Sequence, residues 1–405
     1  MPRKNGVGLA ALGRLVAGTI VCGAGLLATM PPETTLMWRA SIILTEWGHW
    51  LGLLSILLLL KWHRSWLHGT AATLTTVGII LLFIPLARAY DSAVTLADDL
   101  HATFGIPRTI STTDAPPRPQ PLVASDLMFG VSVGDVIVDE HVYDVVDGER
   151  LALDLYRPEF GVDSRPVVMV IHGGGWTDGT KRDFQDLSRY LAARGYVVAN
   201  IGYRLAPAHL FPSPQEDLLK AIQYVKDLET THGVDPTRIA LLGRSAGGQI
   251  AMLGAYTSTD PSIRGVVSLY GPAALRWGYH NPAKEQVVDS GAVLEDYLGG
   301  PPDTHGPQYD AAEPARFVTS ASPPTLFIHG LRDEHVSPFH AEIVSTRLLE
   351  EGVPHIVLRL PWATHGCDFV FSGPCGQLTT FAVEQFLGSV LHGLGAEAAL
   401  EDSIP

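Results

Sequence analysis

The chain has 405 residues, 46% of them hydrophobic, and a formal net charge of −14. Residues 1–95 carry seven Lys/Arg against three Asp/Glu, a balance of +4, which leaves −18 for the remainder. An apolar, mildly basic front that precedes an acidic body argues for a lipid bilayer as a partner and against nucleic acid.

Three apolar runs fill the front of the chain, at residues 7–30, 40–60 and 71–86. Each is about as long as a helix that crosses the hydrocarbon layer. A secretory signal peptide would account for the first run alone, so we expect residues 1–95 to form an anchor of three transmembrane helices. Glu46 and His49 share one face of the second run near its outer end, where a structural role is favoured over a functional one.

Positive charge predicts the orientation of this anchor. Arg3 and Lys4 precede the first run, and the segment KWHRSW separates the second run from the third. Loops rich in Lys and Arg stay in the cytoplasm. Three spans that start there leave the rest of the chain outside, so we expect a multi-pass membrane protein with an extracytoplasmic body.

The body begins after a predicted linker at residues 96–130, which contains the proline-rich stretch STTDAPPRPQP. Over residues 131–395, β-branched runs alternate with helical patterns, except that the first two runs have no helix between them. This pattern predicts one α/β domain with a mostly parallel central sheet, helices on both faces and an antiparallel hairpin at one edge. Residues 274–322 do not fit the alternation and are expected to form an irregular insertion or lid. Residues 396–405 are expected to be a tail.

The stretch LLGRSAGGQIAML places G-x-S-x-G between an apolar strand and an amphipathic helix. In this context the motif is typical of a nucleophile elbow, in which glycines relieve crowding around a serine held on a strained turn. Ser245 is therefore the candidate nucleophile. Its hydroxyl needs a general base, and that base needs an orienting acid.

The expected chain order on this topology is serine, acid, histidine. Asp333 follows the seventh strand-like run by a short turn, which makes it the favoured acid, with Glu334 and Asp368 as alternatives. The loop after the last strand-like run carries His365, which is the favoured base. These loops belong to the carboxyl edge of the sheet, where catalytic groups of open α/β sheets gather.

Two other histidines are alternative bases, His335 and His329. His335 is too near Asp333 in the sequence to come from a different loop, so His365 is favoured. A second glycine cluster, HGGGW, follows the third strand-like run. Glycines let two backbone N–H groups come close to a developing oxyanion, and Ala246 after the serine supplies a third donor.

Cysteine usage is sparse, and Cys367 and Cys375 are the only pair outside the anchor. An oxidising compartment would allow a disulfide between them. Two small buried residues that never meet are the alternative, and the residues alone leave this open.

The segments HGGGW, YRLAP, GRSAGG, HGLRDEHV and THG, in this order, resemble the hormone-sensitive-lipase-like branch of the α/β-hydrolase esterases over residues 134–392. The resemblance implies the α/β-hydrolase fold, with His172 shaping the glycine loop. It implies a triad of Ser245, Asp333 and His365 and oxyanion donors at Gly174, Gly175 and Ala246. We assign substrate binding to Trp176 and Arg244; Arg244 stands where this family usually has an acid.

These features predict a serine carboxylic-ester hydrolase that works through an acyl-enzyme on a small-molecule or lipid ester. This chemistry requires no metal and no organic cofactor. An extracytoplasmic acyltransferase or amidase with the same triad is an alternative, and so is a non-catalytic binding protein that keeps the hydrolase fold.

Overall fold

In the computed structural model, residues 6–60, 66–105, 117–159 and 164–392 are described. The predicted tail at 396–405 lies outside these residues. So do Arg3, Lys4 and residues 61–65, which carry most of the charge that predicts the orientation.

The centre of the molecule is one eight-stranded sheet with the strand order β1-β2-β4-β3-β5-β6-β7-β8. Its strands are β1 (Val136–Val146), β2 (Glu149–Pro158), β3 (Arg165–Ile171), β4 (Val197–Ile201), β5 (Val234–Arg244), β6 (Ile263–Leu269), β7 (Thr325–Gly330) and β8 (His355–Leu360). β1 and β2 form an antiparallel hairpin at one edge, and β2 also runs antiparallel to β4. All the other neighbours are parallel, which confirms the predicted mostly parallel sheet.

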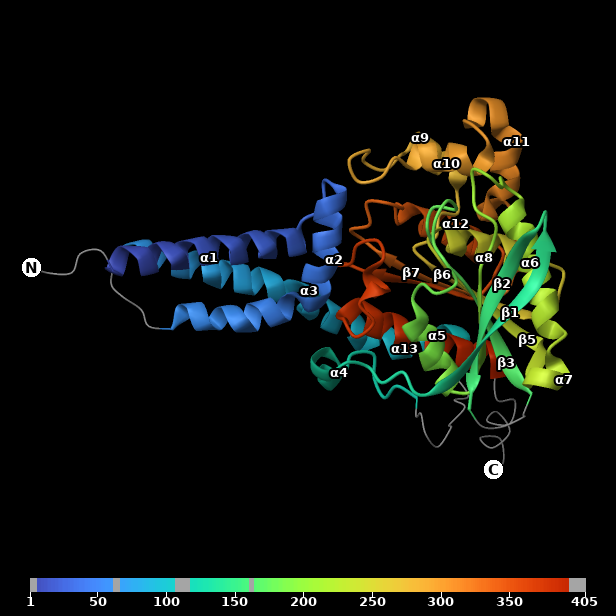
Figure 1. The fold of residues 1–405 in the computed structure, drawn as a ribbon, viewed down its shortest axis with the longest axis horizontal. Helices are drawn as coiled ribbons and strands as arrows, with labels where there is room; N and C mark the ends of the chain where they lie inside the picture. Colours follow the sequence, from blue (N-terminus) through green and yellow to red (C-terminus); the bar gives the residue numbers. More distant parts are fainter. Residues whose placement is uncertain (1–5, 61–65, 106–116, 160–163, 393–405) are drawn as a thin grey trace, which may run out of the picture.

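Helices cover both faces of the sheet because its parallel strands are apolar on both sides (Figure 1). One face packs against α6 (Ser213–Lys226), α8 (Ala246–Thr257) and α12 (Phe339–Glu350). The other packs against α5 (Gln185–Ala193) and α13 (Pro374–His392). Short elements complete the domain: α4 (Ala124–Phe129), α7 (Glu229–His232) and η3 (Cys367–Phe369).

The segment at 274–322 is helical, although its sequence lacks the expected alternation. It contains α9 (Leu275–His280), α10 (Ser290–Leu298), α11 (Pro302–Ala312) and η2 (Pro314–Arg316). We call these residues the insertion. Tyr297 and Tyr309 are fully buried, so the insertion is packed onto the domain and is not a loose loop.

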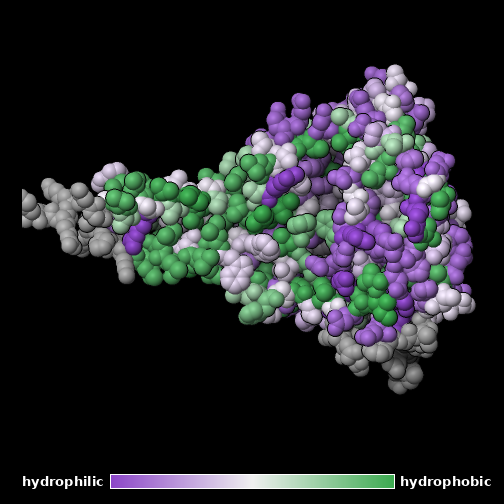
Figure 2. All heavy atoms as spheres, in the orientation of Figure 1, coloured by the Kyte–Doolittle hydropathy of each residue, from purple (hydrophilic) through white to green (hydrophobic). Residues whose placement is uncertain are grey.

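Three helices project from the α/β body as an apolar bundle (Figures 1 and 2). They are α1 (Gly6–Thr29), α2 (Thr35–Ser55), which continues into η1 (Ile56–Leu59), and α3 (Trp66–Phe104). All three are long and apolar enough to cross a membrane. This agrees with the three predicted spans, and we call residues 6–60 and 66–88 the anchor.

The linker prediction is wrong over residues 96–104, because α3 is a helix of 39 residues that contains Pro85 and ends only at Phe104. Its second half belongs to the core of the body: Leu96, Leu100 and Phe104 are buried among residues of α13 and neighbouring strands. The apolar spacing that holds this half against α13 was hidden by the acidic residues around it. The third anchor helix is therefore continuous with the core.

Candidate functional site

Ser245 lies on the sharp turn between β5 and α8 with φ at +51°. A side chain rarely adopts this conformation, and the packing around the turn enforces it. A Cβ at Gly243 would come within 2.0 Å of the Gly247 carbonyl oxygen, and one at Gly247 within 2.3 Å of the Ile171 oxygen. The glycines of the G-x-S-x-G motif are thus required by close backbone contacts, which present the serine side chain at the carboxyl edge of the sheet.

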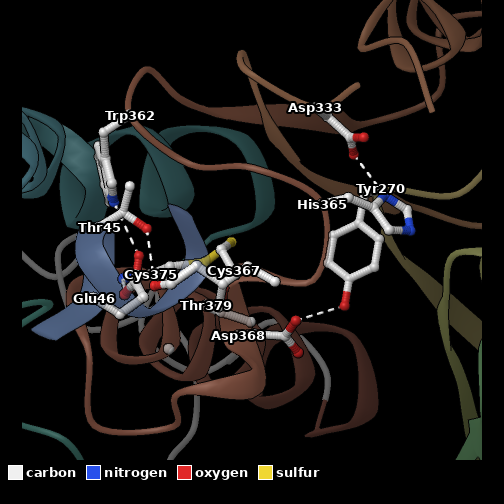
Figure 3. Close-up of a disulfide and its surroundings, with 12 residues drawn as sticks. Thr45, Glu46, Tyr270, Asp333, Trp362, His365, Cys367, Asp368, Cys375 and Thr379 are labelled. Carbon is white, nitrogen blue, oxygen red and sulfur yellow. Dashed lines mark hydrogen bonds and ion pairs between the residues drawn. A yellow bond between two sulfur atoms is a disulfide. The ribbon is translucent and has the colours of Figure 1, made fainter. Parts of the chain in front are cut away.

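The loops after β7 and β8 bring two further side chains to this serine. His365 Nε2 lies 3.0 Å from Ser245 Oγ, and His365 Nδ1 lies 2.7 Å from Asp333 Oδ2. The other carboxylate oxygen of Asp333 accepts hydrogen bonds of 2.9 Å from the backbone N–H groups of His335 and Val336. Figure 3 shows His365 between Asp333 and the ring of Tyr270. The three favoured residues form one continuous hydrogen-bonded chain.

The alternative acids have other partners. Glu334 forms an ion pair with Lys284 at 3.6 Å. Asp368 accepts a 2.6 Å hydrogen bond from Arg244 Nε and one of 2.5 Å from the Tyr270 hydroxyl. Within the described residues, neither carboxylate contacts an imidazole that reaches the serine.

The alternative bases also differ from His365. His329 Nε2 lies 2.9 Å from the Val336 carbonyl oxygen and 3.4 Å from Asp333 Oδ2, so it supports the acid. His335 stacks on His365 with ring centroids 4.9 Å apart. Neither ring has a hydrogen bond to Ser245 among the described residues.

Burial and charge set the ionisation of this cluster. Burial by itself would raise the pKa of Asp333, but attraction to His365 and His329 and their hydrogen bonds lower that pKa well below its ordinary value. Burial, followed by repulsion from His365, lowers the pKa of His335 to about 4. At neutral pH the acid is therefore a carboxylate and the stacked His335 is uncharged.

The HGGGW segment forms a tight loop directly opposite the serine turn. A Cβ at Gly173 would lie 3.2 Å from Ser245 Cβ, so the loop backbone passes next to the serine. Gly174 and Gly175 have φ values of +111° and +60°. Among the described residues, the N–H groups of Gly174, Gly175 and Ala246 donate to no protein acceptor. His172 stacks on Tyr203 at 4.2 Å and shapes the base of the loop.

A cavity of about 900 Å³ lies over Ser245. Its floor contains the glycine loop and His365. The insertion supplies a second wall, which includes Leu275, Trp277 and Val293. Trp38 of α2 also lines the cavity. The sequence did not indicate this, because a tryptophan that contacts a distant loop cannot be distinguished from others in an apolar run.

The two residues assigned to substrate binding lie at the cavity but are largely committed to other contacts. The Trp176 ring is stacked on Tyr297 at 4.3 Å, and its indole N–H donates to Gln249 Oε1 at 2.9 Å. Arg244 is buried in the ion pair with Asp368, and its guanidinium lies 4.4 Å from the centre of the Phe184 ring. Both residues line the cavity, mainly as parts of its framework.

Cys367 and Cys375 are joined by a disulfide in the structure (Figure 3). The bond ties η3, which follows His365, to the first turn of α13. It therefore connects the loop that carries His365 to a helix of the core.

Among the described residues, one group of metal-binding residue types lies on β1 and α7, outside the lining of this cavity. It comprises Asp139, His141 and His232, whose ligand atoms lie within 4.8 Å of one another. The Asp139 carboxylate already pairs with Arg157 at 2.5 Å. A cation would have to displace or tolerate this guanidinium, so the group does not fit a metal well.

Comparisons with known proteins agree with this architecture. The BD-FAE family profile matches residues 153–348. Esterase LipC of Mycobacterium tuberculosis is 31% identical over 276 residues, which cover 63% of this chain and 66% of LipC. The probable carboxylic ester hydrolase LipM of the same organism is 29% identical over 281 residues, or 64% of this chain and 61% of LipM. The chain thus spans less than two thirds of these curated relatives.

Solved structures give the same result for the fold. A hyperthermophilic esterase from Pyrobaculum calidifontis is 27% identical with a TM-score of 0.53, covering 62% of this chain and 83% of that one. A thermostable esterase from Pseudomonas putida, 23% identical, has a TM-score of 0.55 over 64% of this chain and 85% of that one. With the sheet order and the matched segments, these relatives show that the chain has the α/β-hydrolase fold and is similar to the carboxylesterases of that superfamily.

Proposed function

We propose that this protein is a serine esterase that hydrolyses carboxylic esters through an acyl-enzyme. The observation that carries the proposal is the hydrogen-bonded chain in which His365 lies 3.0 Å from Ser245 Oγ and 2.7 Å from Asp333 Oδ2. A scaffold that only kept the fold would not need this contact or the strained turn beneath it. The matched relatives are named esterases, which supports the same reaction class.

In the first half of the reaction, Ser245 Oγ attacks the ester carbonyl carbon while His365 Nε2 takes the hydroxyl proton. The ionised Asp333 keeps the Nδ1–H tautomer and stabilises the imidazolium. When the tetrahedral intermediate breaks down, His365 returns the proton to the leaving alkoxide, and the acyl group stays on Ser245. In the second half, water gives a proton to His365 and attacks the acyl carbon of the acyl-enzyme. His365 returns this proton to Ser245 Oγ as the bond between the acyl group and Ser245 breaks, which releases the acid and restores Ser245.

We assign stabilisation of the oxyanion to the N–H groups of Gly174, Gly175 and Ala246. Their support is positional: the glycine loop passes next to the serine, and these amides have no protein acceptor among the described residues. Fixed donors in a partly dry cavity stabilise charge that develops only in the transition state. Trp176 and Arg244 hold the shape of this cavity and border the substrate.

We also propose that the anchor spans the membrane and that the hydrolase domain lies on its outer side. This proposal is supported by the three apolar helices and by the positive charge that precedes the first and the third of them. The disulfide agrees with an oxidising compartment. The substrate is then a small-molecule or lipid ester met outside the cytoplasm.

The test is Ser245→Ala in the full-length protein, purified in detergent and assayed with short p-nitrophenyl esters. We expect kcat/KM to fall by about 10⁴-fold or more, and labelling by a fluorophosphonate probe to disappear. Ser125→Ala, at an exposed serine of α4, is the matched control and should keep both signals. A Ser245→Ala protein that hydrolyses these esters at the parental rate would refute the proposal.

A further inference from the structure

The anchor docks directly on the loop that carries the acid. Arg332, the residue before Asp333, donates from Nη1 to the Ala28 carbonyl oxygen at 2.6 Å and from Nη2 to the Met30 carbonyl oxygen. These carbonyls belong to the last turn of α1 and the residue after it, which need hydrogen-bond donors. The outer end of the first anchor helix is thus held by a side chain adjacent to the proposed catalytic acid.

The anchor also docks on the loop that carries the base. The indole N–H of Trp38 donates to the His365 carbonyl oxygen at 2.9 Å, and its ring lies 4.2 Å from that of His335. Further along α2, Glu46 accepts hydrogen bonds from the Trp362 indole and the Cys375 backbone N–H at 3.3 and 2.8 Å (Figure 3). A simple tether would need none of these contacts.

The connection between α1 and α2 also holds one rim of the cavity. Thr35 donates from its backbone N–H to the Gln286 carbonyl oxygen at 3.0 Å and from its hydroxyl to that of Val287 at 2.9 Å. Glu33 pairs with Lys284 at 3.0 Å. The exposed residues Asn281, Pro282 and Lys284 line the cavity together with Trp38. The cavity therefore reaches the surface where the insertion meets the outer end of the anchor, and Figure 2 shows the surface hollowed there.

Large apolar side chains are exposed around the end of the anchor that meets the body. Met30 and Leu36 are 55% and 78% exposed on the anchor side, and Leu331 is 45% exposed on the acid loop. On the anchor side of the domain, α4 presents Met128 and Phe129, of which Phe129 is 88% exposed (Figure 1). We call these five residues the apolar collar. Exposed apolar surface beside membrane-spanning helices is expected to sit in the interfacial layer of the bilayer.

On the basis of the proposed esterase activity, we propose that the site takes the ester of a bilayer-resident lipid, such as an acylglycerol, which reaches Ser245 from the membrane through the opening between α2 and the insertion. The collar places this opening at the depth of the lipid ester groups, and the cavity is large enough for an acyl chain. Because Trp38 belongs to both the anchor and the cavity wall, a chain that leaves the bilayer stays in contact with apolar surface along its path.

The experiment uses the full-length protein in phosphatidylcholine vesicles with two substrates, a fluorogenic long-chain diacylglycerol in the bilayer and soluble p-nitrophenyl acetate. Leu36→Asp and Leu331→Asp each place a charge in the collar, one on each side of the junction. We expect each to lower diacylglycerol hydrolysis at least about tenfold, because the charge disfavours the position in which the opening contacts the bilayer. A free-energy cost of about 1.4 kcal/mol for that position is enough to produce a tenfold loss. Hydrolysis of p-nitrophenyl acetate should stay within about twofold, which also shows that the variant is folded.

Leu349→Asp is the matched control, because Leu349 is 73% exposed on α12, outside the collar. It should leave both activities unchanged. Equal diacylglycerol hydrolysis by the wild type and both collar variants would overturn the inference, as would a wild type that hydrolyses the soluble ester but not the lipid. A wild-type protein that hydrolyses neither the diacylglycerol nor p-nitrophenyl acetate would refute the esterase proposal itself.

Discussion

Single side chains decide whether the hydrogen-bonded chain at Ser245 is ready to react. His365 is held at three points: Asp333 binds Nδ1, the Tyr270 ring packs at 4.6 Å, and Trp38 binds the backbone carbonyl. His335 lies between Trp38 and His365, with its ring stacked on that of His365 and tilted against that of Trp38. Since burial lowers the pKa of His335 to about 4, this neighbour brings no positive charge to His365 at neutral pH.

Trp38 should therefore act as a positioning residue for His365. Trp38→Phe keeps an aromatic ring against His335 but removes the N–H that binds the His365 carbonyl. With a soluble p-nitrophenyl ester we expect kcat to fall about tenfold, because a misplaced base costs about 1 kcal/mol or more in the transition state, while KM changes little.

The control for this change is Trp47→Phe, on the same helix, where Trp47 is 49% exposed. Steady-state kinetics of both variants in detergent separate kcat from KM. A Trp38→Phe protein with the wild-type kcat, or one in which only KM rises, would contradict a positioning role.

At the scale of the elements, the sheet and the order of the site residues could be predicted from the sequence. β-branched runs that alternate with helical patterns predict parallel strands, and the carboxyl ends of such strands meet at one edge. Chain direction alone is therefore enough to predict that Ser245, Asp333 and His365 meet from three loops, without any knowledge of side-chain packing.

Contacts between the anchor and the body could not be predicted in this way. A hydropathy pattern treats α2 as a uniform apolar run, although Trp38 and Glu46 on it form hydrogen bonds with residues more than three hundred positions later. The extension of α3 to Phe104 was missed because acidic residues hide the apolar spacing of a stripe that packs against the body. Such pairings depend on tertiary docking, which local periodicity does not encode.

The insertion should limit the length of the acyl chain that the cavity accepts. Val293 of α10 lies over the glycine loop, since a Cβ at Gly175 would come within 3.1 Å of its Cγ1 atom. Val293→Phe adds bulk where the acyl group must pass. We expect kcat/KM for p-nitrophenyl octanoate to fall about tenfold relative to the acetate, a typical effect of steric change in an apolar pocket.

Ala292→Phe is the comparison for this variant, because Ala292 is exposed on another face of α10. The ratio of octanoate to acetate hydrolysis is the measurement, since it cancels differences in the amount of active protein. If both variants keep the wild-type ratio, α10 does not border the acyl chain.

At the scale of the whole molecule, the anchor helices are packed on the domain, so the orientation of the anchor in the membrane also fixes the side on which the domain lies. The C-terminal end of α1, the first half of α2 and the second half of α3 are all packed on the domain. The start of α3, at Trp66, lies at the opposite end of the bundle (Figure 1). If the anchor spans the membrane, Trp66 and the domain must therefore lie on opposite sides of it.

This arrangement permits a direct test of the proposed topology with single thiols. Cys22 lies within an anchor helix and Cys367 is bonded to Cys375, so an introduced surface cysteine is the reactive one. Leu349→Cys, on the domain, should react with a membrane-impermeant maleimide in intact cells, because the positive charge near the first and third spans orients the domain outward. Trp66→Cys should react only after the membrane is permeabilised. The reverse pattern would place Ser245 in the cytoplasm and refute the proposal that the substrate is an ester met outside it. Labelling of both thiols in intact cells would show that α1–α3 do not span the bilayer.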